Sequence, residues 1–161
     1  GVPGIYIHSL LGSENDLLGR QQAEEDGENL STINRRINRE KLDLSEVEAS
    51  IANPESLRGQ VFNAYINFLR TRKQTPAFSP AAGQSVPDIQ NKAVFALLRQ
   101  PKNEPDESVL VLSNLSAQAQ TVTLPKAFAK NTDLLSQQNI SANANGQLTL
   151  AAYQVFCLKS V

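Results

Sequence analysis

Residues 1–16 read GVPGIYIHSLLGSEND, and this stretch decides the predicted fold. A short apolar run from Ile5 to Ile7 follows a Pro-Gly pair and precedes Gly12 and Ser13. This pattern is typical of a buried strand bounded by turns, and a strand buried on both faces usually belongs to a parallel sheet. Because no methionine precedes this strand, we expect the sequence to be cut from a longer polypeptide.

A long loop and a short helix are predicted next. Residues 14–31 show no hydrophobic period and carry a net acidic charge, which indicates an exposed loop of a length that usually serves a site. Asp43 with Glu46 three residues later forms a capping box, and apolar residues at helical spacing follow it. The box predicts a helix over residues 44–52.

A second, longer helix is predicted to extend to about Lys73. Asn53 offers a cap and Pro54 occupies the first helical position. Tyr65 and Phe68 belong to the apolar stripe of this helix, so we expect them to pack in a core rather than stack on sugars. The full stripe comprises Leu57, Val61, Tyr65, Phe68 and Leu69.

From residue 79 onward the hydrophobic period becomes strand-like. Clusters of Pro, Asn, Asp, Gly and Ser separate the apolar segments, which predicts an antiparallel β domain over 79–161. In the last segment the apolar residues change parity after Leu150, so we expect a bulge at Ala151 and Ala152. The segments are 93–100, 108–116, 120–125, 132–136 and 147–160.

Charge and composition disfavour several classes of partner. The chain has 15 Lys plus Arg against 16 Asp plus Glu, so its net charge is −1 and no basic stripe is present for nucleic acid. No apolar run reaches the ~20 residues that cross a bilayer, and no leader resembles a signal peptide. We therefore predict no nucleic-acid or membrane partner and a cytoplasmic location.

A single cysteine and a single histidine restrict the possible chemistry. Cys157, in YQVFCLK, is predicted to be a small buried residue. A nucleophilic role is not expected, because the one histidine, His8, lies at the opposite end of the chain. Without a second histidine or clustered cysteines and carboxylates, neither a metal site nor a cofactor is predicted.

Three stretches together resemble the C-terminal part of the sucrose phosphorylase-like branch of glycoside hydrolase family 13. They are residues 1–16, INREKLDLSEVEASI at 37–51 and FLRTRKQTPAF at 68–78. In that family the last barrel strand reads Gly, any residue, Pro, any residue, aliphatic, Tyr, which Gly1, Pro3, Ile5 and Tyr6 match. The amylase continuation Tyr-Gly-Asp-Glu is replaced by His8-Ser9-Leu10-Leu11-Gly12, as in the phosphorylase branch.

The resemblance implies an α+β fold. Residues 1–78 would be the last βα unit of a (β/α)8 barrel, with strand, loop and two helices, and 79–161 an antiparallel all-β C-terminal domain. The parent enzyme would transfer a glucosyl group with retention between a small α-glucoside and phosphate. The nucleophile, the acid/base and a third Asp would lie on earlier barrel strands, so no catalytic residue is expected in this chain, which alone should be inactive.

The resemblance also implies a sugar-binding rim. Arg39, in Ile37-Asn38-Arg39, would bind the glucosyl unit together with Asn38, because the guanidinium has a fixed fork of donors. The alternatives are the repeated triplet at Ile33-Asn34-Arg35 or an Arg39 that merely pairs with loop acids. His8 falls at the C-terminal end of the strand, where barrel enzymes build their sites, and is a candidate substrate or phosphate contact.

Other interpretations stay open. Glu24, Glu25 and Asp26 are expected to be a solvated acidic run rather than a catalytic pair. The sequence is also compatible with the C-terminal region of an α-amylase-type hydrolase, or with a β carbohydrate-binding module, although a structural β domain is preferred because exposed aromatics are few. Residues 1–13, without a barrel to face, are expected to pack irregularly or to join a second copy in a homodimer.

Overall fold

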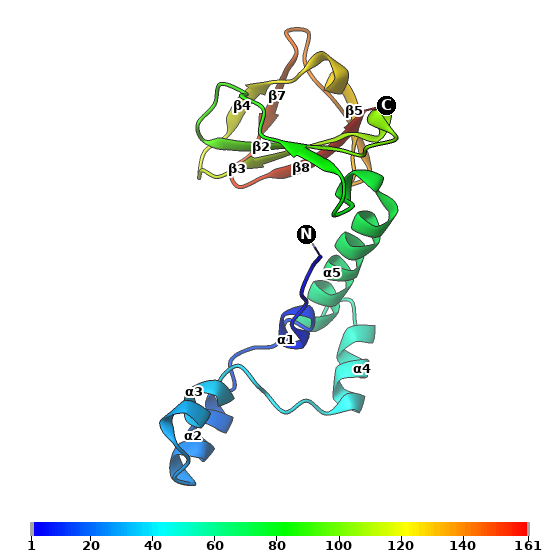
Figure 1. Cartoon of the computed structure of the whole chain (residues 1–161). Helices are drawn as coiled ribbons and strands as arrows, with labels where there is room; N and C mark the ends of the chain where they lie inside the picture. Colours follow the sequence, from blue (N-terminus) through cyan, green and yellow to red (C-terminus); the bar gives the residue numbers. More distant parts are fainter. Residues whose placement is uncertain (1, 161) are drawn as a thin grey trace. The chain divides into compact units, whose positions relative to one another are not determined.

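The computed structural model describes residues 2–160, and the side chain of Ser160 is not described. The chain divides into two compact units, Val2–Phe68 and Leu69–Val161, with the division inside one helix (Figure 1). Among residues 2–160, no helix combines the length and apolar character needed to cross a bilayer.

The first unit is helical (Figure 1). Among the described residues, its buried apolar side chains are few: Leu11, Ala23, Ile33 and Val47. Its helices are α1 (Ile7–Leu10), α2 (Leu17–Glu25), α3 (Leu30–Arg36), α4 (Leu44–Ala52) and α5 (Leu57–Gln74), the last of which crosses the division.

The strand predicted over residues 5–7 is not formed. Ile5 and Tyr6 lie outside regular structure, Ile7 begins α1, and their exposed fractions are 40%, 49% and 52%. A strand is stable only beside a partner, and the described part of the first unit offers no second strand. Gly1, where the strand was expected to begin, lies outside the described residues. Self-association of this segment stays a prediction.

The loop predicted over residues 14–31 is wrong, because α2 and α3 occupy most of it. Asp16 Oδ1 accepts a hydrogen bond from Gly19 N at 2.7 Å, and Asn29 Oδ1 accepts one from Thr32 N at 3.0 Å. These caps satisfy amides that each helix leaves unpaired at its start. Each helix buries a single side chain, so neither produces the hydrophobic period that marks a helix in sequence.

The helix predicted over 44–52 is confirmed as α4. Asp43 Oδ1 accepts hydrogen bonds from the amides of Ser45 and Glu46 at 2.9 and 3.1 Å, as the capping box predicts. The second helix is confirmed as α5, but it begins at Leu57 rather than at Pro54. Ser56 is the residue that caps it, since its Oγ accepts from Gly59 N at 2.9 Å.

The predicted burial of the α5 stripe is only partly seen. Tyr65 is half-buried, whereas Leu57 and Phe68 are 58% and 56% exposed. The expectation that Phe68 packs in a core is therefore wrong for the described structure.

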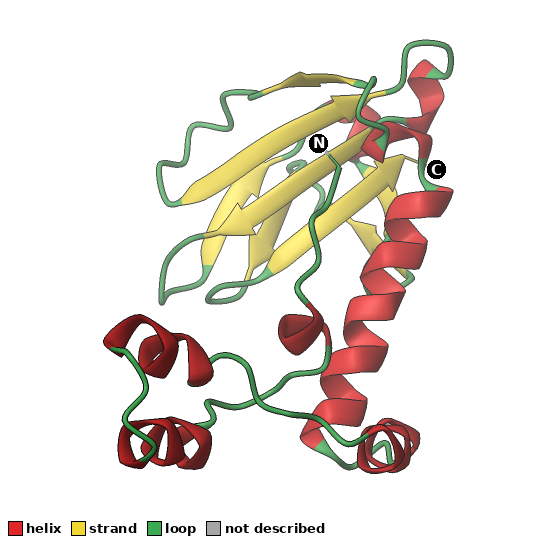
Figure 2. Ribbon diagram, turned by 60° about the horizontal axis from the view of Figure 1, so that its bottom comes forward, coloured by secondary structure: helices red, strands yellow, loops and turns green. Residues whose placement is uncertain are grey.

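The second unit is an antiparallel β domain, which confirms the α+β class (Figure 2). One sheet has the strand order β1-β2-β3-β8-β5-β6, and the other pairs β4 with β7. The strands are β1 (Gly83–Ser85), β2 (Val94–Gln100), β3 (Val109–Asn114), β4 (Gln120–Thr123), β5 (Lys130–Asp133), β6 (Gln138–Ser141), β7 (Gln147–Leu150) and β8 (Val155–Ser160). Three short 3-10 helices accompany the strands: η1 (Pro76–Phe78) precedes β1, and η2 (Pro105–Glu107) and η3 (Lys126–Phe128) lie in the connections β2–β3 and β4–β5.

The core lies between the two sheets. Leu110, Leu112 and Leu158 from the larger sheet and Leu150 from the smaller one are fully buried there. The sequence pattern did not predict β1 and β6, because both strands are short and mostly exposed and have no alternating apolar residues.

The bulge predicted at Ala151 and Ala152 is wrong. These residues lie in a turn between β7 and β8, in which Tyr153 has a φ of 57°, and the turn moves the chain from the smaller sheet to the larger. Buried Asn114 holds this turn, since its Nδ2 donates to the carbonyls of Ala151 and Gln118, each at 2.7 Å. The change of parity therefore reflects two strands in two sheets that face one core.

Cys157 is buried, as predicted. Its amide donates to Asp133 Oδ1 at 2.8 Å, and burial, together with the Asp133 charge, raises the pKa of the thiol from 9.0 to about 12. A thiol with so high a pKa is a poor nucleophile at neutral pH.

We expect this thiol to make the chain less stable in alkali. In the unfolded chain the thiol ionises near its ordinary pKa, so the stability it contributes is complete below pH 9.0 and is lost as pH rises toward about 12. At about pH 10.5 the loss should be ~2 kcal/mol. Guanidinium unfolding at about pH 8 and about pH 10.5 should show a smaller loss for Cys157→Ala than for the natural chain. Equal losses in the two proteins would contradict the buried-thiol explanation.

Candidate functional site

His8 and Asn38, two of the predicted site residues, line one hollow in the first unit. Its volume is about 410 Å³. The described residues around it are Tyr6, His8, Ser9, Gly12, Ser13, Glu14, Asn15 and Asn38.

His8 is oriented by the end of α1. Gly12 has a φ of 59°, Ser13 N donates to His8 O at 2.9 Å and Gly12 N to Ser9 O at 3.4 Å, which is a glycine-terminated helix cap. The cap turns the chain back, so that Ser13 Oγ lies 3.1 Å from His8 Nδ1. The other ring nitrogen, Nε2, has no hydrogen-bond partner among the described residues.

Tyr6 connects the two candidates. Its ring lies against the His8 ring, with centroids 5.3 Å apart and planes inclined at 53°. Its hydroxyl donates to Asn38 O at 2.7 Å, across 32 residues of sequence. Asp16 N donates to the neighbouring carbonyl, Ile37 O, at 2.8 Å.

Arg39 is exposed and does not line the hollow. Within residues 2–160 its guanidinium makes no hydrogen bond or ion pair. Three acidic residues of this unit pair with other arginines: Glu24 with Arg20 at 3.0 Å, Glu28 with Arg36 at 3.9 Å and Glu40 with Arg58 at 3.8 Å. The surface-pairing alternative for Arg39 is therefore not realised in this structure, while its role in sugar binding stays a prediction.

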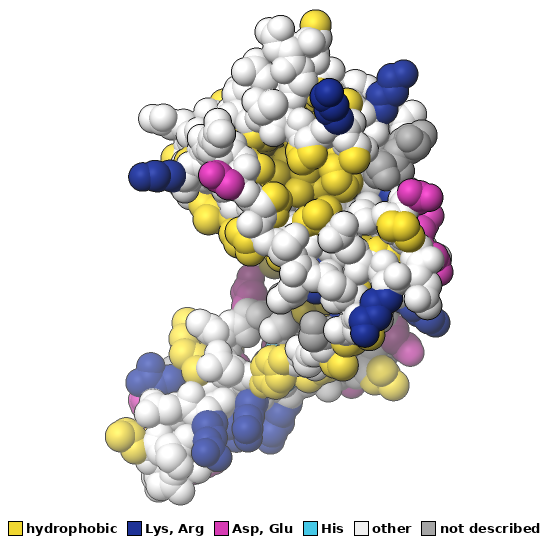
Figure 3. Space-filling view, turned by 45° about the horizontal axis from the view of Figure 1, so that its top comes forward, with side chains coloured by type: hydrophobic (Ala, Val, Ile, Leu, Met, Phe, Trp, Pro, Cys, Tyr) yellow, Lys and Arg dark blue, Asp and Glu magenta, His cyan; other side chains and the backbone are white. Residues whose placement is uncertain are grey.

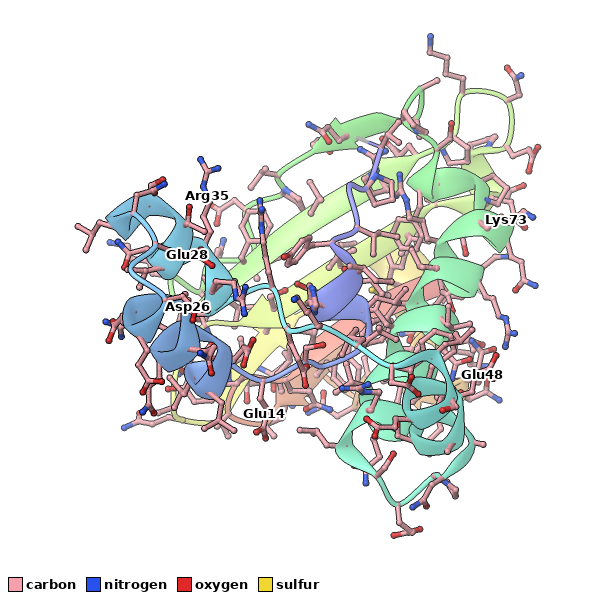
Figure 4. All side chains as sticks on the ribbon, turned by 90° about the horizontal axis from the view of Figure 1, so that it is seen from below. Glu14, Asp26, Glu28, Arg35, Glu48 and Lys73 are labelled. Carbon is pink, nitrogen blue, oxygen red and sulfur yellow. The ribbon has the colours of Figure 1, made fainter. Side chains whose placement is uncertain are left out.

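Arg35, from the repeated triplet, lies in α3 and projects outward from that helix (Figure 4). It is exposed and also lies outside the hollow.

Glu24, Glu25 and Asp26 lie at the end of α2 and are exposed. Glu25 accepts from Gln21 at 2.9 Å and Asp26 from Gln22 at 3.1 Å, so each carboxylate binds its own helix.

The hollow offers hydroxyls, amides, an imidazole and the carboxylate of Glu14. Such groups suit the hydroxyls of a small polar ligand. Among the described residues no group of three or more potential metal ligands is present. Sequence analysis missed Tyr6 and Ser13 as site residues, because an exposed tyrosine and a serine in a turn carry no signal until their partners are known.

Known proteins are similar to the chain in both its helical part and its β domain. Residues 94–155 match the family model of the α-amylase SusG C-terminal domain. The glucosylglycerate phosphorylase of Spirochaeta thermophila is 42% identical over 128 residues, which cover 80% of this chain and 20% of that protein. The glucosylglycerate phosphorylase of Escherichia coli is 30% identical over 160 residues, or 99% of this chain and 26% of that protein.

A solved structure is also similar to this chain. A mutant of MutB, from Pseudomonas mesoacidophila, in complex with sucrose matches with a TM-score of 0.52 and 27% identity, over 70% of this chain and 19% of that one. The chain belongs to glycoside hydrolase family 13 and corresponds to the C-terminal region of its enzymes. Within family 13 it is related to the glucosylglycerate phosphorylases, of which it spans about a fifth to a quarter.

Gly12→Ala should destabilise the first unit more than Gly27→Ala. Both glycines have positive φ, of 59° and 69°, so alanine is strained at both, by about 1 kcal/mol. An added Cβ at Gly12 would lie 3.0 Å from Val61, whereas at Gly27 it would meet nothing within 4 Å. We expect an extra ~1 kcal/mol or more for Gly12→Ala from this overpacking. Urea unfolding, monitored by far-ultraviolet circular dichroism, measures the free energy of unfolding of each variant. Equal losses of stability in the two variants would rule out the Val61 contact.

Proposed function

We propose that this sequence is part of a longer enzyme that transfers a glucosyl group, with retention, between a small α-glucoside and phosphate. The observation that carries the proposal is the 42% identity to a protein named glucosylglycerate phosphorylase. Glucosylglycerate is accordingly the glucoside that we propose for the parent enzyme. The small sugar and phosphate are its proposed partners, and no cofactor is required by this chemistry.

The proposed contribution of the first unit is a sugar-binding rim. Retaining transfer uses two carboxyl groups about 5 Å apart on opposite sides of the scissile bond. Glu14 is the one carboxylate among the described residues that line the hollow, so we propose that the catalytic pair is supplied by another part of the parent. Arg39 would hold sugar hydroxyls with its guanidinium fork, and His8 and Asn38 would supply further hydrogen bonds.

The proposed contribution of the β domain is structural. Figure 3 shows hydrophobic side chains gathered on one face of the second unit, and an apolar surface of this kind favours packing against other protein. In this proposal residues 1–78 belong to the barrel and residues 79–161 form the β domain.

The isolated chain should show no phosphorolysis or hydrolysis of glucosylglycerate or sucrose, because it would lack the carboxylate pair. The complete enzyme containing this sequence should release glucose phosphate from glucosylglycerate only when phosphate is present. Product analysis after incubation with and without phosphate tests both expectations. Turnover by the isolated chain that disappears on mutation of one of its own residues would overturn the fragment hypothesis. Phosphate-independent hydrolysis by the complete enzyme would favour the amylase-type alternative.

Arg39→Ala, made in the complete enzyme, should lower kcat/KM by at least about tenfold, because contacts to the transferred sugar are lost. Arg35→Ala is the matched control, since it removes another exposed arginine four residues away and should change kcat/KM by less than about twofold. Steady-state kinetics with glucosylglycerate and phosphate compare the two. A larger effect of Arg35→Ala would show that the first triplet is the functional one.

A further inference from the structure

Two consecutive carbonyls fix the peptide that carries Arg39. Ile37 O accepts from Asp16 N at 2.8 Å, and Asn38 O accepts from the Tyr6 hydroxyl at 2.7 Å. Both donors come from the segment that also carries His8. Asp16 is itself fixed, because its carboxylate caps α2 through Gly19 N.

The same peptide is tied to α3 from its other side. Asn38 N donates to Arg35 O at 3.3 Å, and Arg39 N donates to Arg36 O at 2.9 Å. The main chain beside Arg39 is therefore bound by α3 through its amides and by the segment of His8 through its carbonyls. The Arg39 guanidinium itself binds none of the described residues. Arg35 stands one turn back in α3, without a tie to the segment of His8.

We infer that Tyr6 is a positioning residue for Arg39, an inference that rests on the proposed role of Arg39 in sugar binding. The Tyr6 hydroxyl donates to the carbonyl directly before Arg39, and the centroid of the Tyr6 ring lies 5.3 Å from that of the His8 ring. One side chain thus contacts both the peptide that carries Arg39 and the ring of His8. A site needs its binding groups held close to their productive geometry, and a hydrogen bond to the adjoining peptide does this without occupying the guanidinium.

Tyr6→Phe isolates the hydroxyl, because phenylalanine keeps the ring against His8. In the 161-residue chain, hydrogen exchange should be at least about threefold faster at the amides of Asp16, Asn38 and Arg39, since loss of one hydrogen bond frees the shared peptide. The amide of Ile33, which donates to the carbonyl of the α3 cap residue Asn29, is the internal reference and should not change. Unchanged exchange at residues 16, 38 and 39 would overturn the positioning role whatever the enzyme does.

Kinetics of the complete enzyme separate positioning from general stability. Tyr6→Phe should lower kcat/KM about three- to tenfold in the natural background, the range expected for one hydrogen bond. In an Arg39→Ala background it should lower kcat/KM by less than about twofold, because the two residues act through one contact. Tyr153→Phe, at an exposed tyrosine of the second unit, is the matched control and should leave kcat/KM unchanged.

The outcomes test the positioning role of Tyr6 separately from the proposed role of Arg39 in sugar binding. An equal loss from Tyr6→Phe in both backgrounds would overturn the inference and leave Tyr6 a merely structural residue. If Arg39→Ala has no kinetic effect while the exchange at residues 38 and 39 still rises, the proposed role of Arg39 fails, and with it the functional part of the inference, although the hydrogen bond itself is real.

Discussion

The candidate site depends on hydrogen bonds to the main chain of residues 37 and 38, because the first unit has little apolar core to hold it. Its four buried apolar side chains are distributed over the unit, one each in α2, α3 and α4 and one just after α1. A net hydrogen bond contributes about 1 kcal/mol, so each tie is weak but directional. Several such ties together hold the peptide near one geometry, which suits residues that must meet a ligand.

Sequence patterns predicted the helices of the first unit where a cap and a hydrophobic period coincided, as at Asp43 and the residues of α4. They failed for α2 and α3, where the caps Asp16 and Asn29 were present but each helix buries one side chain. They failed at residues 5–7 for the opposite reason. There the apolar pattern is strand-like, but a strand forms through partners that the described first unit does not supply.

In the β domain, alternation predicted the longer strands because burial between two sheets imposes a period of two. The error at Ala151 came from treating β7 and β8 as one strand. What the local pattern could not reveal is that Asn114, distant in sequence, binds the carbonyl of Ala151 and stabilises a turn between sheets. A buried amide satisfied by several carbonyls is invisible in sequence, since its partners are main-chain atoms that any residue supplies.

The same limit explains why Arg39 could be proposed only through resemblance. An exposed arginine without partners has no local signature, and Arg35 presents the same residue types in the same order. The structure adds a physical difference, because the peptide of Arg39 is bound from two sides while that of Arg35 continues a helix. Ties through main-chain atoms hold a segment in place and still leave its side chains unengaged. A binding rim requires that combination, since a guanidinium already paired with a carboxylate would have to break that pair before it could bind a sugar.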